Sequence, residues 1–131
     1  MNRLGVRFQV KHLLGVALAS AALTLTGCDS GPELGEVHGT VRLDGKPVAG
    51  VMLEFQPEEG ETSYGTTNQQ GEYKLRFDRQ RDGAVVGKHK VKITPDDDSR
   101  VRIPARYNEE TTLVETVQPG KNQIDFDLKA N

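Results

Sequence analysis

The sequence predicts an all-β domain, a seven-stranded antiparallel sandwich that follows an N-terminal leader. Apolar side chains recur at every second position over most of the chain after residue 35, which is the period of strands with one buried face. Turn residues separate seven such segments at a spacing of roughly 8 to 12 residues, which is typical of a sandwich. No segment after the leader has the 3.6-residue period of an amphipathic helix. The 131 residues provide enough chain for one core.

The leader has the composition of a secretory signal. Arg3, Arg7 and Lys11 give it a basic start, and residues 13–25 then carry no charge. A helix over that apolar run would reach about 20 Å, whereas the hydrocarbon core of a bilayer is about 30 Å thick. The pattern therefore favours a cleaved signal peptide over a permanent transmembrane helix.

The apolar run ends in Leu25-Thr26-Gly27-Cys28, which resembles the bacterial lipobox. In that motif small residues precede the cleavage point, and the cysteine thiol receives a diacylglyceryl group. We therefore predict a lipoprotein signal peptide at 1–27 and lipidation of Cys28 by acyl chains such as palmitate. The alternative is an ordinary signal peptide cut near Ala21 or Gly27, which leaves Cys28 as a free thiol. Cys28 is the only cysteine, so no internal disulfide can form.

Lipidation at Cys28 predicts where the mature protein is located. Residues 28–35 comprise the lipidated cysteine and a short tether, and 36–131 form the domain. Two or more acyl chains anchor a protein stably, so we expect a periplasmic or surface-facing protein of the bacterial cell envelope, bound to the lipid bilayer. The leader takes three of the 17 basic residues and none of the 19 acidic ones. The acidic mature chain gives no reason to expect nucleic-acid binding.

The first predicted strand covers residues 36–43, and the tight-turn pair Asp44-Gly45 follows it. A second strand covers 48–56 and a loop covers 57–61. A polar third strand at 62–67 is expected at a sheet edge. The other four predicted strands are 72–77, 88–94, 111–117 and 124–128, with turns or loops at 68–71, 78–83, 96–110 and 118–122.

The inward phase of these strands follows from the alternation. It places Leu53 and Phe55 of the second strand and Val91 and Ile93 of the fifth in the core. The phase of the sixth strand is ambiguous, because Glu115 falls between two apolar residues. The core is large enough that no metal or disulfide is required for stability.

Four segments together resemble the carboxypeptidase regulatory-like, or transthyretin-like, domain. They are residues 37–51, the run Thr-Asn-Gln-Gln-Gly-Glu-Tyr at 67–73, and the segments 83–91 and 103–108, which are similar to those of small bacterial lipoproteins that carry this domain. The likeness covers residues 36–129. It implies a prealbumin/Ig-like sandwich that serves as an accessory or interaction module.

Some transthyretin-like relatives are hydroxyisourate hydrolases, whose site combines histidines and an arginine with a C-terminal Tyr-Arg-Gly-Ser. This chain ends in Asp127-Leu128-Lys129-Ala130-Asn131 and lacks that signature. The departure argues against the hydrolase activity.

The residues suited to acid–base or nucleophilic chemistry are few. His38 lies on the polar phase of its predicted strand and His89 on the apolar phase, so a shared site would need a bulge. We expect a solvated His38 and a hydrogen-bonded His89. Ser30, Ser63 and Ser99 lie outside any Gly-x-Ser-x-Gly motif. We therefore predict that the protein is not an enzyme.

Three successive aspartates at 96–98 could offer oxygen ligands to calcium. They lack the alternating Asp-x-Asp-x-Asp-Gly pattern of a calcium loop, so a solvated acidic loop is the preferred interpretation. We expect no metal and no cofactor.

A cationic surface is the first candidate binding feature. Lys88, Lys90 and Lys92 share one phase, and Lys74 and Arg76 share an outward phase on another strand. If the two strands were neighbours, this face could attract anionic headgroups or polysaccharide. The alternative is pairing across strands with carboxylates such as Glu54, Asp125 or Asp127.

The loop at 103–108 is the second candidate, with Arg106 and Tyr107 as its binding residues. The alternative is structural: Pro104 and Tyr107 pin a long crossover onto the core, with the Tyr107 hydroxyl hydrogen-bonded.

Together these features predict a membrane-anchored lipoprotein with a non-catalytic structural or interaction module at the cell envelope. Its partner would be an envelope protein or a glycan. One alternative is a carbohydrate or small-ligand binding module, which the absence of tryptophan disfavours. The other alternative is a transthyretin-like hydrolase, which the missing C-terminal signature disfavours.

Overall fold

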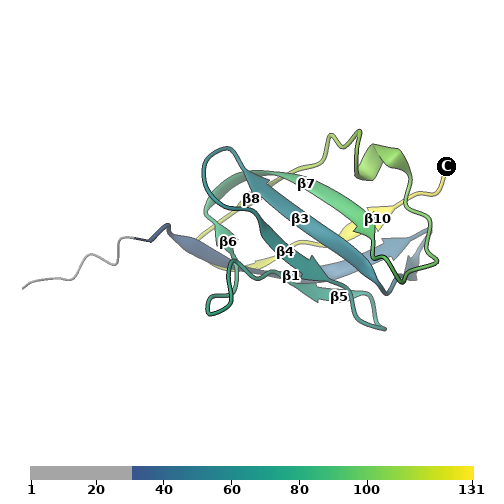
Figure 1. The fold of residues 1–131 in the computed structure, drawn as a ribbon, viewed down its shortest axis with the longest axis horizontal. Coiled ribbons are helices and arrows are strands. Elements are labelled where there is room, and N and C mark those ends of the chain that lie inside the picture. Colours follow the sequence, from purple (N-terminus) through teal and green to yellow (C-terminus); the bar gives the residue numbers. More distant parts are fainter. Residues whose placement is uncertain (1–30) are drawn as a thin grey trace, which may run out of the picture.

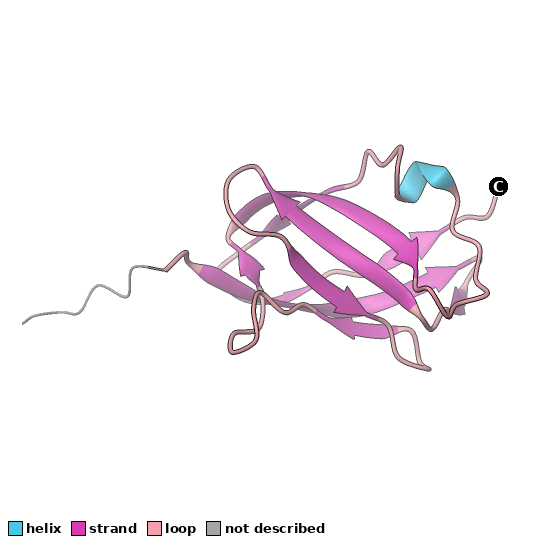
Figure 2. Cartoon of the chain, in the orientation of Figure 1, coloured by secondary structure: helices cyan, strands magenta, loops and turns pink. Residues whose placement is uncertain are grey.

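The computed structural model describes residues 31–131 and folds them into ten strands in two sheets (Figures 1 and 2). The predicted signal peptide at 1–27 and Cys28 lie outside the described residues. The two sheets enclose one core as a β-sandwich, which confirms the predicted all-β class. One 3-10 helix, η1 (Ala105–Tyr107), lies in the segment predicted to be irregular. No helix within residues 31–131 is long and apolar enough to span a bilayer.

One sheet is antiparallel throughout. Its strands lie in the order β4 (Ser63–Thr66), β3 (Val51–Pro57), β7 (Gly87–Pro95) and β8 (Val114–Val117). β3 begins three residues later than predicted, because Gly50 has a φ of +69° and belongs to the turn that precedes the strand.

The other sheet is built around β1 (Leu34–Leu43), the longest strand. Its antiparallel partners are β2 (Lys46–Pro47), β5 (Glu72–Lys74) and β6 (Ala84–Val85), and its partners on the opposite side are β9 (Gly120–Gln123) and β10 (Phe126–Leu128). β9 and β10 run parallel to β1, whereas an antiparallel sandwich was predicted. A parallel neighbour needs a long crossover, and the crossover here, residues 44–119, contains the whole second sheet together with β2, β5 and β6.

The C-terminal strand accounts for part of the difference between ten strands and the seven predicted. β9 and β10 keep one constant register against β1, from Gly35 opposite Gly120 to Leu43 opposite Leu128. The ladder is irregular at residues 124 and 125. The Ile124 N–H still donates to the His38 carbonyl at 2.9 Å, but the Ile124 carbonyl and the Thr40 N–H take side-chain partners. The Tyr73 hydroxyl donates to the Ile124 carbonyl at 2.5 Å, and Asp125 Oδ1 accepts from the Thr40 N–H at 2.9 Å.

The prediction of a turn over 118–122 is wrong for its second half, which belongs to β9. A buried polar side chain explains the error. Asn122 occupies an inward position, where its Nδ2 donates to the carbonyls of Glu36 at 2.9 Å and Gln118 at 2.8 Å, and its Oδ1 accepts from the Gln118 N–H at 2.9 Å. Glycine and asparagine close together in a sequence indicate a turn. The structure shows that Asn122 itself lies in β9 and that its side chain stabilises the preceding turn by bonding to the backbone of Gln118.

The predicted inward phases are confirmed by burial. Phe55 of β3 and Phe126 of β10 meet in an edge-to-face contact of 6.2 Å that links the two sheets. Each large side chain removed from water contributes about 1.5 to 3 kcal/mol. The buried hydrophobic strand residues include Val37, Val41, Val51, Leu53, Phe55, Tyr73, Val91, Ile93, Val117, Phe126 and Leu128.

The phase of β8 is also settled. Val117 is fully buried and Leu113 packs against the core, so Glu115 shares their inward phase. Burial raises the pKa of the Glu115 carboxyl. β8 is an edge strand of its sheet, and Glu115 is only partly buried there, which limits the cost of its inward position.

Gly39 in the middle of β1 allows the closest approach in the sheet. A Cβ on this residue would overlap the Ile124 carbonyl oxygen and lie 3.0 Å from the Tyr73 ring. We predict that Gly39→Ala lowers the free energy of unfolding by about 3 kcal/mol, as overpacking of a core does. Chemical denaturation followed by circular dichroism measures the change.

Gly31→Ala is the matched control, because an added Cβ there approaches only the end of the flexible Arg81 side chain. Its stability should equal that of the wild type. A Gly39→Ala variant within 0.5 kcal/mol of the wild type would contradict the packing described here.

Candidate functional site

A shallow groove runs along the side of the sandwich where β4 and β5 meet. Its volume is about 720 Å³. The groove is lined by His38, Tyr64, Gly65, Thr66, Asn68, Glu72, Tyr73, Lys74 and Arg76. These residues come from β1, β4, β5 and the segments that flank β5, so strands of both sheets contribute.

The groove exists because the chain changes sheets immediately after β5. Lys74 pairs with His38 in the sheet of β1, whereas two residues later Arg76 exchanges backbone hydrogen bonds of 3.0 and 2.8 Å with Tyr64 of β4. Gly65 permits this crossing, since a Cβ there would lie 2.7 Å from the Lys74 carbonyl oxygen. The crossing ties the two sheets together along this side.

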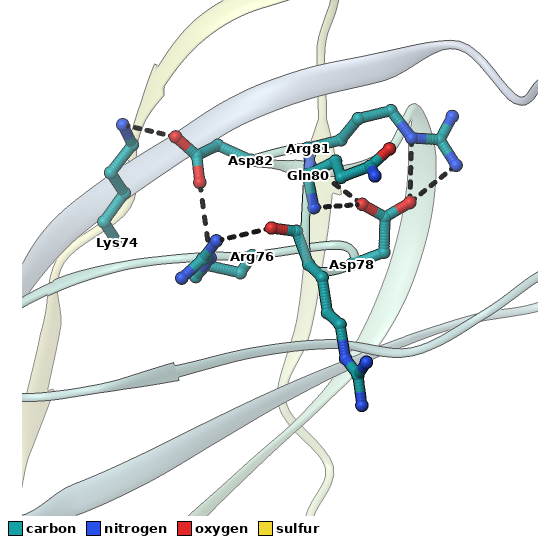
Figure 3. Close-up of polar contacts among 7 residues, drawn as sticks. Lys74, Arg76, Asp78, Gln80, Arg81 and Asp82 are labelled. Carbon is teal, nitrogen blue, oxygen red and sulfur yellow. Dashed lines mark hydrogen bonds and ion pairs between the residues drawn. The ribbon is translucent and has the colours of Figure 1, made fainter.

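Two cations of the groove share one carboxylate (Figure 3). Lys74 Nζ lies 2.8 Å from Asp82 Oδ2, and Arg76 Nε lies 3.6 Å from Asp82 Oδ1. The hydrogen bond and charge of Asp82 raise the pKa of Lys74, and the same contact with Lys74 lowers the pKa of Asp82. All three side chains are exposed, so the pairs orient the cations more than they stabilise the fold.

The loop that carries Asp82 is held in shape by its own hydrogen bonds. Asp78 Oδ1 accepts from the N–H groups of Gln80 and Arg81 at 2.8 Å, and Asp78 Oδ2 accepts from Arg81 Nε at 2.8 Å (Figure 3). The bond from Gln80 is the main reason that the pKa of Asp78 is lowered. The Arg81 guanidinium lies 4.8 Å from the centre of the Phe77 ring. The turn therefore returns Asp82 to a position opposite Arg76.

The groove also presents an aromatic ring and an imidazole. Tyr64 is 47% exposed and lies directly opposite Arg76. His38 is exposed and lies opposite Lys74. A ring face beside cations and hydrogen-bonding groups can hold an anionic or hydroxylated partner by stacking and polar contacts. The arrangement offers recognition chemistry.

The predicted cationic face is divided by the fold. Lys74 belongs to β5, whereas Lys88, Lys90 and Lys92 belong to β7 in the other sheet, and β4 and β3 lie between β7 and Arg76. The condition that the two strands be neighbours is therefore not met. Glu54 lies directly opposite Lys92 in the strand register, but among residues 31–131 no ion pair joins their side chains. The carboxylate that binds Lys74 is Asp82, which was not among the predicted partners.

The loop at 103–108 is pinned to the C-terminal strand. The Tyr107 hydroxyl accepts from the Lys129 N–H at 3.0 Å, and the Arg106 guanidinium donates to the Lys129 carbonyl. The N–H of Lys129 is the main reason that the pKa of Tyr107 is lowered, and Arg106 adds to the effect from its place 4.8 Å from the ring centre. Arg106 and Tyr107 thus have structural partners, as the second interpretation of this loop expected.

The two histidines of the described chain are not brought together. His38 faces outward from β1, while His89 is 1% exposed and faces the core from β7. His89 Nε2 lies 2.5 Å from the Val85 carbonyl oxygen, and its ring contacts Phe55 at a centroid distance of 5.7 Å. The expected solvated and hydrogen-bonded roles are confirmed for both residues.

The remaining candidate residues lie apart from the groove. Ser63 is fully buried, and the Ser99 hydroxyl accepts from the Val101 N–H at 3.2 Å. Asp96 Oδ1 accepts from the Asp97 N–H at 2.7 Å. Within residues 31–131 no three histidine, cysteine or carboxylate side chains gather closely enough to hold a metal ion. Cys28 lies outside the described residues.

Sequence reasoning missed Tyr64, His38 and Asp82 as parts of one site. The signal for Asp82 was available: an aspartate turn at Asp78 brings a residue six positions beyond Arg76, and eight beyond Lys74, back beside these cations. Tyr64 and His38 gave no comparable signal, because their proximity depends on the crossing between sheets. Comparison of the chain with protein-family models and with curated protein sequences gave no match.

The shared carboxylate gives a titration prediction. In Asp82→Asn the pKa of Lys74 should fall toward its ordinary value, because the main cause of its increase is removed. In the wild type, the lowered pKa of Asp82 means that the stabilising pair is present above the unfolded pKa of an aspartate. That stability is lost as the pH falls through the lowered value.

Titration of the Lys74 side chain by nuclear magnetic resonance measures the shift. Glu72→Gln is the control, since Glu72 is an exposed groove carboxylate on the same strand. An equal pKa of Lys74 in the wild type and in Asp82→Asn would show that the pair does not form in solution.

Proposed function

We propose that this chain is a lipid-anchored lipoprotein of the bacterial cell envelope, and that its β-sandwich is a non-catalytic interaction module. The observation that carries the proposal is the position of the lipobox-like cysteine relative to the fold. Cys28 precedes Leu34, the first residue of β1, by only six positions. An extended segment of that length reaches roughly 20 Å, so an anchor at Cys28 would keep one end of the sandwich beside the membrane.

The anchored end is distinct from the opposite one. The described chain enters the sandwich at one end and its C-terminus lies at the other (Figure 1). β6 and the acidic loop after β3 lie at the entry end, where a cavity is lined by two carboxylates, Glu58 and Glu59, and by one cation, Lys88. With Glu61, this loop carries more carboxylates than cations, so it does not attract anionic headgroups. The acyl chains would therefore supply the attachment, and the rest of the surface stays available to partners.

The groove between β4 and β5 is the surface we assign to partner binding. It lies along the side of the sandwich, so it stays accessible when one end faces the membrane. It combines the exposed Tyr64 ring with Lys74 and Arg76, whose side chains Asp82 orients. Such a surface suits the binding of an envelope protein or a glycan, without chemical conversion of that partner.

We further propose that the domain is carboxypeptidase regulatory-like, or transthyretin-like. Support comes from the hydrogen bonds and backbone conformation of the Thr-Asn-x-x-Gly-x-Tyr run at 67–73. The Thr67 hydroxyl accepts from the Val51 N–H at 3.1 Å, and Asn68 Oδ1 accepts from the N–H groups of Gln70 at 2.9 Å and Glu72 at 3.0 Å. Gly71 has a φ of +75°, and the Tyr73 hydroxyl bonds across β1. Each specified residue of the motif thus stabilises the turn or the packing of the strands, which suits a structural module.

The anchor is tested at Cys28. The wild-type protein should partition into the membrane fraction and carry acyl groups on Cys28 by mass spectrometry, whereas Cys28→Ala should lose both properties because it lacks the acceptor thiol. Ser30→Ala, which lies outside the lipobox-like run, is the control and should behave as the wild type. An unmodified thiol on mature wild-type protein would refute the lipoprotein assignment.

The interaction role is tested in the groove. A photoreactive amino acid in place of Tyr64 should crosslink an envelope protein or glycan in intact cells. The same group in place of Thr116, an exposed residue of β8 on a different strand edge, is the control and should not capture that partner. Absence of a Tyr64-specific adduct would remove the groove as the binding surface.

A further inference from the structure

The outer edge of the β1 sheet is open along β9 and β10. Along this strand the Ile124 N–H donates to the His38 carbonyl at 2.9 Å, and the Leu128 carbonyl accepts from the Asp44 N–H at 2.9 Å. Residues of even number thus face β1, and the alternation of a strand directs the odd-numbered backbone groups outward. Among residues 31–131 no strand pairs with that outer side. The outward positions are Lys121, Gln123, Asp125 and Asp127.

Both ends of this open edge are closed by specific residues. Pro119 has no N–H to offer a neighbouring strand. At the other end the Lys129 N–H donates to the Tyr107 hydroxyl at 3.0 Å, and the Lys129 carbonyl accepts from Arg106. The open edge is therefore limited to residues 121–127. Ile124 is its centre, equidistant from the two closing residues.

We propose that a second copy of this chain pairs with this edge, antiparallel and around a twofold axis at Ile124. In that register Lys121 of one copy lies opposite Asp127 of the other, and Gln123 lies opposite Asp125. The edge is thus complementary to itself in charge through Lys121 and Asp127. Within one copy Gln123 Nε2 already donates to Asp125 Oδ2 at 3.2 Å, and Asp125 Oδ1 accepts from the Thr40 N–H, so this second pair adds backbone hydrogen bonds only. All four outward positions are used, and each pair is of the kind that exchanges two backbone hydrogen bonds.

The two neighbouring registers give fewer backbone hydrogen bonds or place like charges opposite each other. An axis at Gln123 would place Asp127 opposite Pro119, which has no N–H to share. An axis at Asp125 would place two like carboxylates face to face and Lys121 opposite Lys129, whose backbone groups are already bonded to the 103–108 loop. Charge and edge length therefore select the axis at Ile124.

Twofold pairing also leaves no unpaired strand edge at residues 121–127 of either copy. An open strand edge invites unlimited association, whereas an isologous contact buries the same edge on both copies and closes the assembly at two. Since β1 runs parallel to β9, the two β1 strands start at opposite ends of the joined sheet, about 33 Å apart. Where the proposed anchor is present, the strands of a dimer would lie along the membrane surface, whereas a single copy would stand with its anchored end beside the membrane. The pairing itself does not rest on the anchor.

Disulfide crosslinking of the full-length protein in the oxidising bacterial envelope tests the register. Lys121→Cys and Asp127→Cys, coexpressed, should form a crosslinked dimer, because directly paired Cα atoms lie about 5.5 Å apart and a disulfide spans that distance. Either variant alone should stay uncrosslinked, since two 121 positions lie roughly 20 Å apart. Lys121→Cys with Lys74→Cys, on the opposite side of β1, is the control.

The crosslinking outcomes are decisive in both directions. A dimer band specific to the mixed pair supports the register. No band when both variants are present in the same fraction, or an equal band from either variant alone, overturns it. Membrane fractionation of the same cells reports the lipid anchor separately, so failure of one proposal is distinguishable from failure of the other.

Charge reversal supplies a second readout in purified full-length protein in detergent. Lys121→Asp places a carboxylate opposite Asp127 of the second copy twice per dimer, and should weaken self-association about tenfold. Adding Asp127→Lys should restore it. Within one copy these residues face Glu36 and Arg42, contacts that the second substitution does not repair, so restored association reports the contact between copies. Equal dissociation constants for the wild type and Lys121→Asp would overturn the proposal.

Discussion

The contact between Tyr73 and Ile124 across Gly39 is the constraint on which the rest of the structure depends. Gly39 lies between β5 on one side and the β9–β10 strand on the other, with Tyr73 as its partner in β5. Because Gly39 has no side chain, the Tyr73 ring crosses over β1 and its hydroxyl reaches the Ile124 carbonyl at 2.5 Å. Burial raises the pKa of Tyr73, so the hydroxyl remains a donor. One row of three residues thus joins the first strand to the last.

The second organising feature is the passage of the chain from one sheet to the other after Lys74. The same crossing closes the β4 side of the sandwich and creates the groove, because the two strands diverge where they change partners. The loop that follows, which internal hydrogen bonds to Asp78 hold in shape, places Asp82 beside Lys74. Fold closure and the candidate binding surface are therefore consequences of one backbone path.

Some edges of the two sheets are covered by other residues of the chain and one is open, and this difference bears on function. The β4 edge is covered by Arg76, and the end of β10 is covered by the loop that carries Arg106 and Tyr107. Covering groups remove backbone donors and acceptors from solvent, which limits nonspecific association. The segment 121–127 lacks such cover within the described chain and carries alternating polar residues instead. Loops and edges therefore divide the surface into protected and available parts.

The sequence by itself determined the all-β class, most strand positions and the buried phase of each strand. Those properties depend on the local alternation of side chains, as with Val91 and Ile93 of β7. The lipobox-like run at Cys28 and the opposite environments of His38 and His89 were likewise readable from local pattern.

Only the tertiary structure decided which strands are neighbours. Local alternation carries no information about partners, so it could not predict the parallel pairing of β1 with β9 or the position of Asn122 inside a strand. The same limitation separated Lys74 from the lysines of β7, since equal phase on two strands does not place them in one sheet. The physical reason is that neighbours are selected by the packing of the whole core, in which contacts such as that of Tyr73 with Ile124 join residues far apart along the chain.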